Sequence, residues 1–346
     1  MIFGATDYRW QLRDYLSRVG WLHGLVACLI GLPFFGIALV GEGEAGEIYR
    51  WAAIALPFML MSWFVRRAFY TRSAIGHAVL ADLVYALLLL GGLVVIQKTN
   101  SLSGMSIYAP FIGASLGCII YYLVACRFFN DPPSTVSIND RELVVRHWNY
   151  GKWMMAATLA SSLSTLMYAP VLALVASLEA AAAYKAIQNM ALPLTQILAA
   201  FSLLLLPVLS RRLDSHAHEA ARSWLHFGFL GYVAAAAAYG VLMMAFGLPL
   251  IHKLYANAFY AEYVWMIPFF VVVLVMTSAC QFLGLVVRAW EAPRIILLAK
   301  VVAGGGVLLG FGLVPVFRLK GVLFCMMASV LLELCVMVAY CYRRRR

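Results

Sequence analysis

The chain has 346 residues, of which 64% are hydrophobic and 12% charged, and its mean hydropathy is +0.88. Soluble domains carry about 25% charged residues, so this composition excludes a water-soluble globular protein and indicates one whose main solvent is lipid. The net charge of +11 does not indicate a nucleic-acid binder, because the Lys and Arg residues lie in short segments between apolar runs.

Ten apolar segments approach or exceed the length of about 20 residues that a helix needs to cross the hydrocarbon core. We therefore predict an all-α polytopic membrane protein with about ten transmembrane helices. The predicted spans are 20–41, 51–65, 76–96, 107–126, 153–177, 187–209, 224–250, 263–287, 293–315 and 321–342.

One long polar stretch, 127–152, interrupts this apolar chain. It predicts a cytoplasmic linker between an N-terminal lobe of four spans, 20–126, and a C-terminal lobe of six spans, 153–342. A basic segment, 1–19, precedes the first lobe, and a basic tail, 343–346, follows the second.

The distribution of basic residues supports ten spans with both termini in the cytoplasm. Of the 26 Lys and Arg residues, 20 fall in alternate connections on one side and at the two ends of the chain. Basic residues accumulate on the cytoplasmic side of membrane proteins, so a missed or invented span in mid-chain would break this alternation.

Two basic turns suggest an internal repeat. The first reads VRRAFYTR (65–72) and the second VVRAWEAPR (286–294), and each precedes a span with one charge near its start followed by glycines. If the turns correspond, the first four spans align with the last four, and the N-terminal lobe is two helices short of the C-terminal one. This alignment predicts a fragment, a misplaced start or a shortened paralogue.

Two segments resemble the O-antigen and capsule type of polysaccharide flippase in the multidrug/oligosaccharidyl-lipid/polysaccharide exporter superfamily. They are RRAFYTRSAIGHAVLADLVYALLLLGG (66–92) and EAAAAYKAIQNMALPLTQILAAFSLLLLPVLSRR (179–212). The resemblance implies a two-lobed, MATE-like helix bundle in the bacterial inner membrane, with a central cavity that opens alternately to each side. It also implies a lipid-linked oligosaccharide as cargo.

Charged residues inside spans are costly and mark candidate sites. Glu333 lies midway along the last span, where it is either a cation or proton site or a carboxyl that is protonated or paired to a neighbouring helix for packing. Lys300 and Asp82 lie about two turns inside their spans. Lys300 either reaches the headgroups by snorkelling or faces a cavity, and Asp82 is either an interfacial cap or a cavity partner.

Hydroxyl and amide side chains form a stripe on each of two consecutive spans. They recur mostly at spacings of three and four on the fifth span and of seven on the sixth, which places each set on one helix face. Such stripes either line a cavity that binds sugar groups or join neighbouring helices. The members are Thr158, Ser161, Thr165 and Tyr168, followed by Gln188, Thr195 and Ser202.

Four arginines in the predicted cytoplasmic turns are candidates for contact with an anionic headgroup, although the positive-inside rule alone also accounts for them. They are Arg67, Arg72, Arg288 and Arg294. The seven cysteines contain no CxxC pair, and we predict neither a metal site nor a cofactor, with H⁺ or Na⁺ as candidate coupling ions.

The predicted function is therefore export or flipping of a lipid-linked oligosaccharide or polysaccharide precursor by alternating access. The expected partners are membrane lipids, the lipid-linked glycan and other polysaccharide assembly proteins. The alternatives are an ion-coupled multidrug antiporter of the same fold, a membrane-embedded glycan-processing enzyme and an inactive helper subunit. The predicted outer loops are too short to hold a catalytic domain, and no Walker A, HExxH or GxSxG motif occurs, so we predict no enzyme activity.

Overall fold

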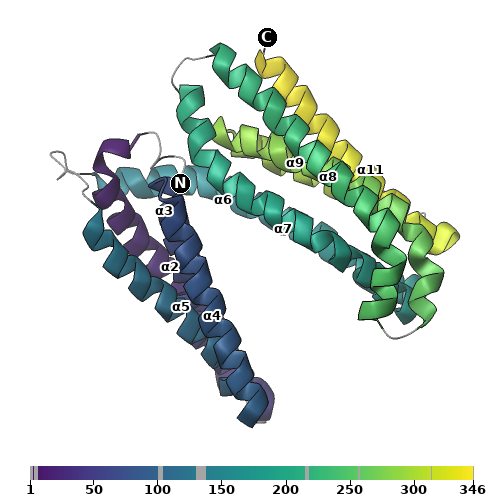
Figure 1. The fold of residues 1–346 in the computed structure, drawn as a ribbon, viewed down its shortest axis with the longest axis horizontal. Helices are drawn as coiled ribbons and strands as arrows, with labels where there is room; N and C mark the ends of the chain where they lie inside the picture. Colours follow the sequence, from purple (N-terminus) through teal and green to yellow (C-terminus); the bar gives the residue numbers. More distant parts are fainter. Residues whose placement is uncertain are drawn as a thin grey trace. The chain divides into compact units, whose positions relative to one another are not determined.

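The computed structural model describes residues 3, 7–99, 104–129, 138–214, 218–255, 258–312 and 314–345. Within these residues the structure is helical and contains no strand (Figure 1). The elements are η1 (Arg9–Gln11), α2 (Leu12–Val40), α3 (Gly43–Thr71), α4 (Ile75–Thr99), α5 (Gly104–Ala125), η2 (Cys126–Phe128), α6 (Asp140–Val175), α7 (Leu178–Asp214), α8 (His218–Leu254), η3 (Ala258–Met266), α9 (Ile267–Ala289), α10 (Pro293–Phe311) and α11 (Val314–Arg345).

The ten long helices α2 to α11 correspond one to one with the ten predicted spans. Nine of them are long and apolar enough to cross a membrane when only the described residues are counted, and the tenth, α10, lies within the predicted range 293–315. Many of their large apolar side chains are exposed, such as Leu83, Leu87 and Leu90 on α4. The protein is therefore a multi-pass membrane protein whose outer surface is suited to lipid.

The chain divides into two compact units, Met1–Asp140 and Arg141–Arg346. This boundary falls inside the predicted linker 127–152, of which residues 130–137 lie outside the described part of the chain. The second half of the linker is not a loop, because α6 begins at Asp140, well before the predicted span at 153. Charged residues such as Arg141 and Glu142 form helix readily, so the helix continues beyond the apolar stretch that marks the membrane.

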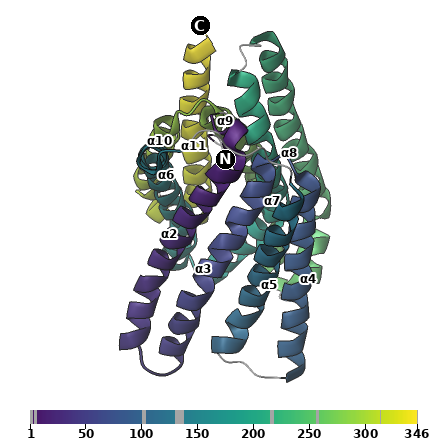
Figure 2. The same ribbon diagram turned by 90° about the vertical axis from the view of Figure 1, so that its left-hand side faces the viewer.

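The first unit is a bundle of α2, α3, α4 and α5, in which α3 packs against the other three helices (Figure 2). Its core contains Phe69, Ala78, Ala81 and Cys118. Close packing of α2 on α3 depends on Gly31, because a Cβ there would lie 2.9 Å from the carbonyl oxygen of Ala53. Pro57 has no N–H to bond that carbonyl, so α3 carries a local irregularity where α2 approaches most closely.

The second unit contains α6 to α11, and α9 is its central helix. It packs against α7, α8, α10 and α11, and most of its residues are buried. The contact with α8 requires a glycine, since a Cβ at Gly228 would lie 2.6 Å from the ring of Phe282. The central position of α9 matters for the site, because its polar residues Thr277 and Gln281 then lie inside the unit.

The two turns identified as a repeat have the same backbone geometry. Ser73 and Glu291 both have left-handed backbone angles, with φ of 60° and 54°. In each turn the next residue donates a backbone hydrogen bond to the residue five positions before it, from Ala74 to Phe69 at 2.9 Å and from Ala292 to Val287 at 3.2 Å. This is the Schellman pattern of helix termination. It aligns Ser73 with Glu291, which is three positions out of register with the sequence match of Arg67 to Arg288.

Candidate functional site

The second unit contains a cavity of about 310 Å³ lined by α6, α7, α9, α10 and α11. We call it the tyrosine cavity, after Tyr168 and Tyr184. Its lining is apolar in part, but each of the five helices contributes a polar or charged group. These are Ser161, Thr165, Tyr168, Tyr184, Gln188, Thr195, Thr277, Lys300, Ser329 and Glu333.

Three hydroxyl groups of this cavity, those of Thr165, Thr195 and Ser329, donate to backbone carbonyls and are left to accept hydrogen bonds. Thr165 donates its own hydrogen to the carbonyl oxygen of Ser161, and Thr195 donates to that of Leu192, each at 2.8 Å. Ser329 donates across the helix interface to Ala303 at 3.0 Å. With its hydrogen used on the backbone, each hydroxyl retains only lone pairs. The cavity therefore suits a ligand with many O–H donors.

An ion pair between Lys300 on α10 and Glu333 on α11 lies in the wall of this cavity. The Lys300 Nζ and Glu333 Oε1 atoms are 2.7 Å apart, and the two side chains are 27% and 11% exposed. A lone acidic residue in mid-membrane costs about 2.5–3.5 kcal/mol on insertion scales, so the pair neutralises a charge that would be costly by itself. The ammonium group of Lys300 thus contacts a carboxylate within the unit.

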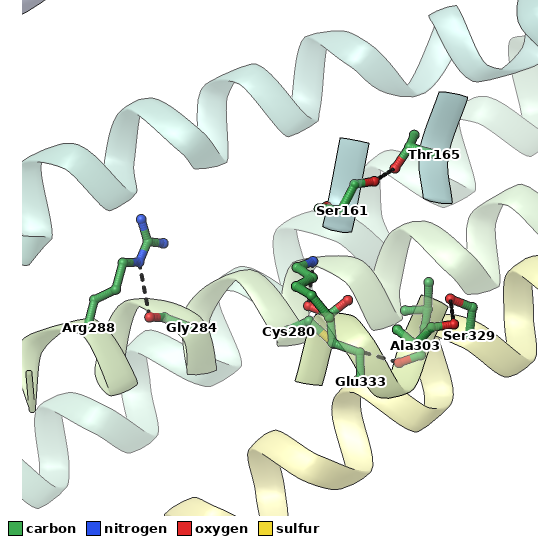
Figure 3. A network of polar contacts seen from close by, with 10 residues as sticks. Ser161, Thr165, Cys280, Gly284, Arg288, Ala303, Ser329 and Glu333 are labelled. Carbon is green, nitrogen blue, oxygen red and sulfur yellow. Dashed lines mark hydrogen bonds and ion pairs between the residues drawn. The ribbon is translucent and has the colours of Figure 1, made fainter. Parts of the chain in front are cut away.

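The same ion pair contributes to a second cavity, of about 350 Å³, which we call the arginine cavity after Arg288. The Arg288 Nε donates to the carbonyl oxygen of Gly284 at 3.1 Å. Figure 3 shows this hydrogen bond together with Cys280 and Glu333. Thr158, which donates to Met154 at 2.9 Å, lies on its α6 wall. The other polar groups of the lining are Ser161, Ser162, Thr277, Gln281, Lys300 and Glu333.

Most of the predicted cavity residues are brought together in these two cavities, but Ser202 and Asp82 lie elsewhere. Ser202 is buried and its hydroxyl lies 2.9 Å from that of Tyr232 on α8, so it joins two helices. Asp82 belongs to the first unit, where its Oδ1 lies 3.0 Å from the Nε of Arg66. That contact is an ion pair without hydrogen-bond geometry.

The predicted headgroup-contact arginines occupy different environments. Arg67 is exposed, whereas the Arg72 guanidinium lies 4.7 Å from the ring centre of Phe129. Arg294 lies 4.9 Å from the ring centre of Trp153. Arg288 alone among the four lines one of the two cavities described above. Stacking on an aromatic ring holds a guanidinium in place at a membrane boundary without using its hydrogen-bond donors.

Sequence reasoning missed several cavity residues, chiefly on α9. Thr277 and Gln281 are four positions apart in a largely apolar span, and this spacing is a signal that could have identified them. Tyr184 lies four positions before Gln188, and the same spacing could have added it to the stripe on α7. Among the described residues, no group of three or more His, Cys, Asp or Glu side chains is placed to hold a metal ion.

The fold is that of MATE transporters. The structure matches a MATE transporter in complex with MaD5 with a TM-score of 0.84 and 13% identity, covering 99% of this chain and 80% of that one. It also matches a mutant Vibrio cholerae MATE transporter, VcmN, with a TM-score of 0.81 and 14% identity, covering 99% of this chain and 81% of that one. An outward-facing multidrug resistance MATE transporter of the MOP superfamily gives 0.79 at 13% identity, with 99% and 80% covered.

At this level of identity the structural matches establish the fold and leave the substrate undetermined. No curated protein sequence matches the chain. The family model described as polysaccharide biosynthesis protein matches residues 11–213, which is more than half of the chain. Family and fold together indicate a membrane transporter rather than an enzyme, and the chain belongs to the polysaccharide biosynthesis protein family.

Proposed function

We propose that the chain flips a lipid-linked oligosaccharide, or a related polysaccharide precursor, across a bacterial inner membrane by alternating access. The observation that carries this proposal is a polysaccharide biosynthesis family match in a chain with the fold of a transporter. In the proposed orientation both chain termini are cytoplasmic, which agrees with the distribution of 20 of the 26 basic residues.

The chemistry of the tyrosine cavity supports a sugar ligand. Sugars present many hydroxyl donors, and the hydroxyls of Thr165 and Thr195 are left as acceptors by their bonds to the backbone. The amide of Gln188 adds a group that can both donate and accept, and its Oε1 already accepts from Lys185 at 2.8 Å. No bond is made or broken in such a cycle, and the lipid tail remains in the membrane while the head moves.

The ion pair also bears on the alternative of a multidrug cation antiporter. Such an antiporter needs an acidic group that a cation can approach, and Glu333 is the acidic residue of the tyrosine cavity. Its carboxylate is already neutralised by Lys300 at 2.7 Å. A cationic drug would have to displace an internal ammonium group, which favours a neutral or anionic cargo. Coupling to H⁺ or Na⁺ remains compatible with this proposal.

The test is reconstitution of the purified chain in proteoliposomes that contain a fluorescent lipid-linked oligosaccharide. Flipping removes the labelled head from a membrane-impermeant quencher added outside, and the wild-type chain should accelerate this loss of quenching over protein-free liposomes. A chain that moves a cationic dye under a proton or sodium gradient, but not the glycan lipid, would favour the antiporter. Activity only in the presence of a second flippase would favour a helper role.

Two neighbouring residues on α7 offer a matched pair for this assay. Gln188→Leu changes the cavity lining, whereas Asn189→Leu changes an exposed position outside it. The flipping rate should fall several-fold in the first variant and remain close to wild type in the second. Equal rates in both variants would remove the tyrosine cavity from the transport pathway.

A further inference from the structure

The tyrosine and arginine cavities share four lining residues, which we call the girdle: Ser161, Thr277, Lys300 and Glu333. Each comes from a different helix, respectively α6, α9, α10 and α11. Cavities that share one lining residue from each of four helices must be adjacent to each other. The girdle therefore marks a single level of the unit at which the two cavities meet.

On α9, α10 and α11, residues on either side of this level line different cavities, whereas on α6 Ser162, directly after Ser161, still lines the arginine cavity. On α9, Phe270 and Leu274 precede Thr277 and line the tyrosine cavity, while Gln281 and Arg288 follow it and line the arginine cavity. The helices α10 and α11 show the same division about Lys300 and Glu333, with Ile296 and Met337 in the arginine cavity. The cavities are thus stacked end to end along the helix axes.

The stacked cavities extend over most of the membrane. Helices rise about 1.5 Å per residue, so the stretch of α9 from Phe270 to Arg288 is about 27 Å long. The hydrocarbon core is about 30 Å thick. Both cavities are lined at intervals by hydroxyl, amide or charged groups, and each is large enough for several water molecules, which occupy buried cavities where polar partners exist.

We infer that the two cavities are the halves of one water-filled passage through the second unit, closed at its middle by the girdle, with the Lys300–Glu333 ion pair as the closure. Ser161 and Thr277 carry short side chains, so the long side chains of the pair are the groups that fill the girdle. The two side chains are 27% and 11% exposed, which leaves each in contact with cavity space. Water on both sides lowers the cost of separating them.

This passage suits water and small ions, and its closure is independent of any glycan. The inference therefore does not rest on the proposed function. The test uses the 346-residue chain with its seven cysteines replaced, in sealed membrane vesicles. One new cysteine is placed in each cavity, Gln188→Cys in the tyrosine cavity and Gln281→Cys in the arginine cavity. The probe is a membrane-impermeant cationic methanethiosulfonate reagent added to one side at a time.

With the ion pair intact, each cysteine should react quickly from one side and at least tenfold more slowly from the other. Adding Glu333→Ala should raise the slow rate about tenfold at both positions. The charge-exchanged variant, Lys300→Glu with Glu333→Lys, should restore the slow rate. The adjacent Leu332→Ala, at an exposed position outside both cavities, is the matched control and should change nothing.

Slow rates that are unchanged by Glu333→Ala would overturn the inference, as would equal labelling from both sides with the pair intact. If Glu333→Ala fails to fold, the nearly isosteric Glu333→Gln provides the same comparison, with an expected rise of about threefold. Because no glycan is present in these vesicles, loss of flipping activity in the reconstituted assay has no bearing on the outcome.

Discussion

The helix pairs α3–α4 and α9–α10 close through the same turn but carry opposite charges at the same position. Asp82 is the ninth residue after Ser73, and Lys300 is the ninth after Glu291. The packing residues around the turns are also equivalent: Phe69 and Val287 lie four positions before the left-handed residue, and Ala81 and Ala299 lie eight after it, and all four are fully buried. The turn and its packing residues are therefore repeated in the two helix pairs, whereas the sign of the charge at the equivalent position is not.

The partners of these two charges differ as well. Asp82 pairs with Arg66 on the adjacent helix α3, and their side chains are 42% and 28% exposed. Lys300 pairs with Glu333 on α11, where the carboxylate is only 11% exposed. The first pair stabilises a hairpin near a membrane boundary, whereas the second lies between two cavities. Repeated packing thus supports one structural ion pair and one at a candidate transport site.

The largest expected effect is the difference in unfolding free energy lost when the cation of each ion pair is removed. Lys300→Met leaves Glu333 without its cation and should lower the free energy of unfolding by about 2–4 kcal/mol, somewhat less than for a fully buried pair. Arg66→Met leaves Asp82 with more solvent contact and should cost about 1 kcal/mol or less. Thermal unfolding in detergent, followed by tryptophan fluorescence, would measure both differences.

A double variant provides the control for this comparison. Lys300→Met combined with Glu333→Gln removes both charges and should recover most of the stability lost in the single variant, because an unpaired carboxylate no longer remains. Equal losses for Lys300→Met and Arg66→Met would show that the two pairs are energetically alike, contrary to the difference in their exposure.

The sequence predicted the membrane-spanning helices because they depend on composition alone. A lipid core requires long apolar segments, and each predicted range overlaps one of the helices α2 to α11. The stripe of Ser161, Thr165 and Tyr168 was also predictable, since helical periodicity places these residues on one face. Periodicity could not reveal that Lys300 faces Glu333, because this depends on how two separate helices are rotated against each other.

The same limit explains the position of Ser202, and a different one explains the start of α6 at Asp140. A spacing of seven places Gln188, Thr195 and Ser202 on one stripe of α7, but the tyrosine cavity does not extend to Ser202, where Tyr232 packs instead. Hydropathy placed the start of the fifth span at 153, yet α6 begins at Asp140, because the end of a helix and the edge of the membrane are set by different forces.

An intermediate effect tests whether the scaffold itself is equivalent in the two units. Ala81→Leu and Ala299→Leu each insert a large side chain at a fully buried position and should destabilise by about 1–3 kcal/mol. Similar losses in unfolding free energy are expected, because the two alanines occupy the same place relative to the turn. The exposed neighbours Leu80 and Leu298 also correspond, and Leu80→Ala and Leu298→Ala should have little effect.

The smallest expected effect lies in the turns. Ser73 and Glu291 have φ of 60° and 54°, a conformation that costs a non-glycine residue about 1 kcal/mol and glycine very little. Ser73→Gly should therefore raise the free energy of unfolding by about 0.5–1 kcal/mol. Glu291→Gly should gain less, because its carboxylate also lies 3.8 Å from the Arg146 guanidinium, a half-exposed ion pair of small energy.

Paired thermal unfolding curves of the two glycine variants would resolve this difference if the curves are recorded under identical detergent conditions. The control is Ala74→Gly, at the next position, where the backbone is not left-handed, and this variant should destabilise slightly. A loss of stability in Ser73→Gly would mean that the serine side chain contributes more than the strain of its backbone costs. The two turns would then have the same backbone geometry but respond differently in unfolding free energy to substitution by glycine.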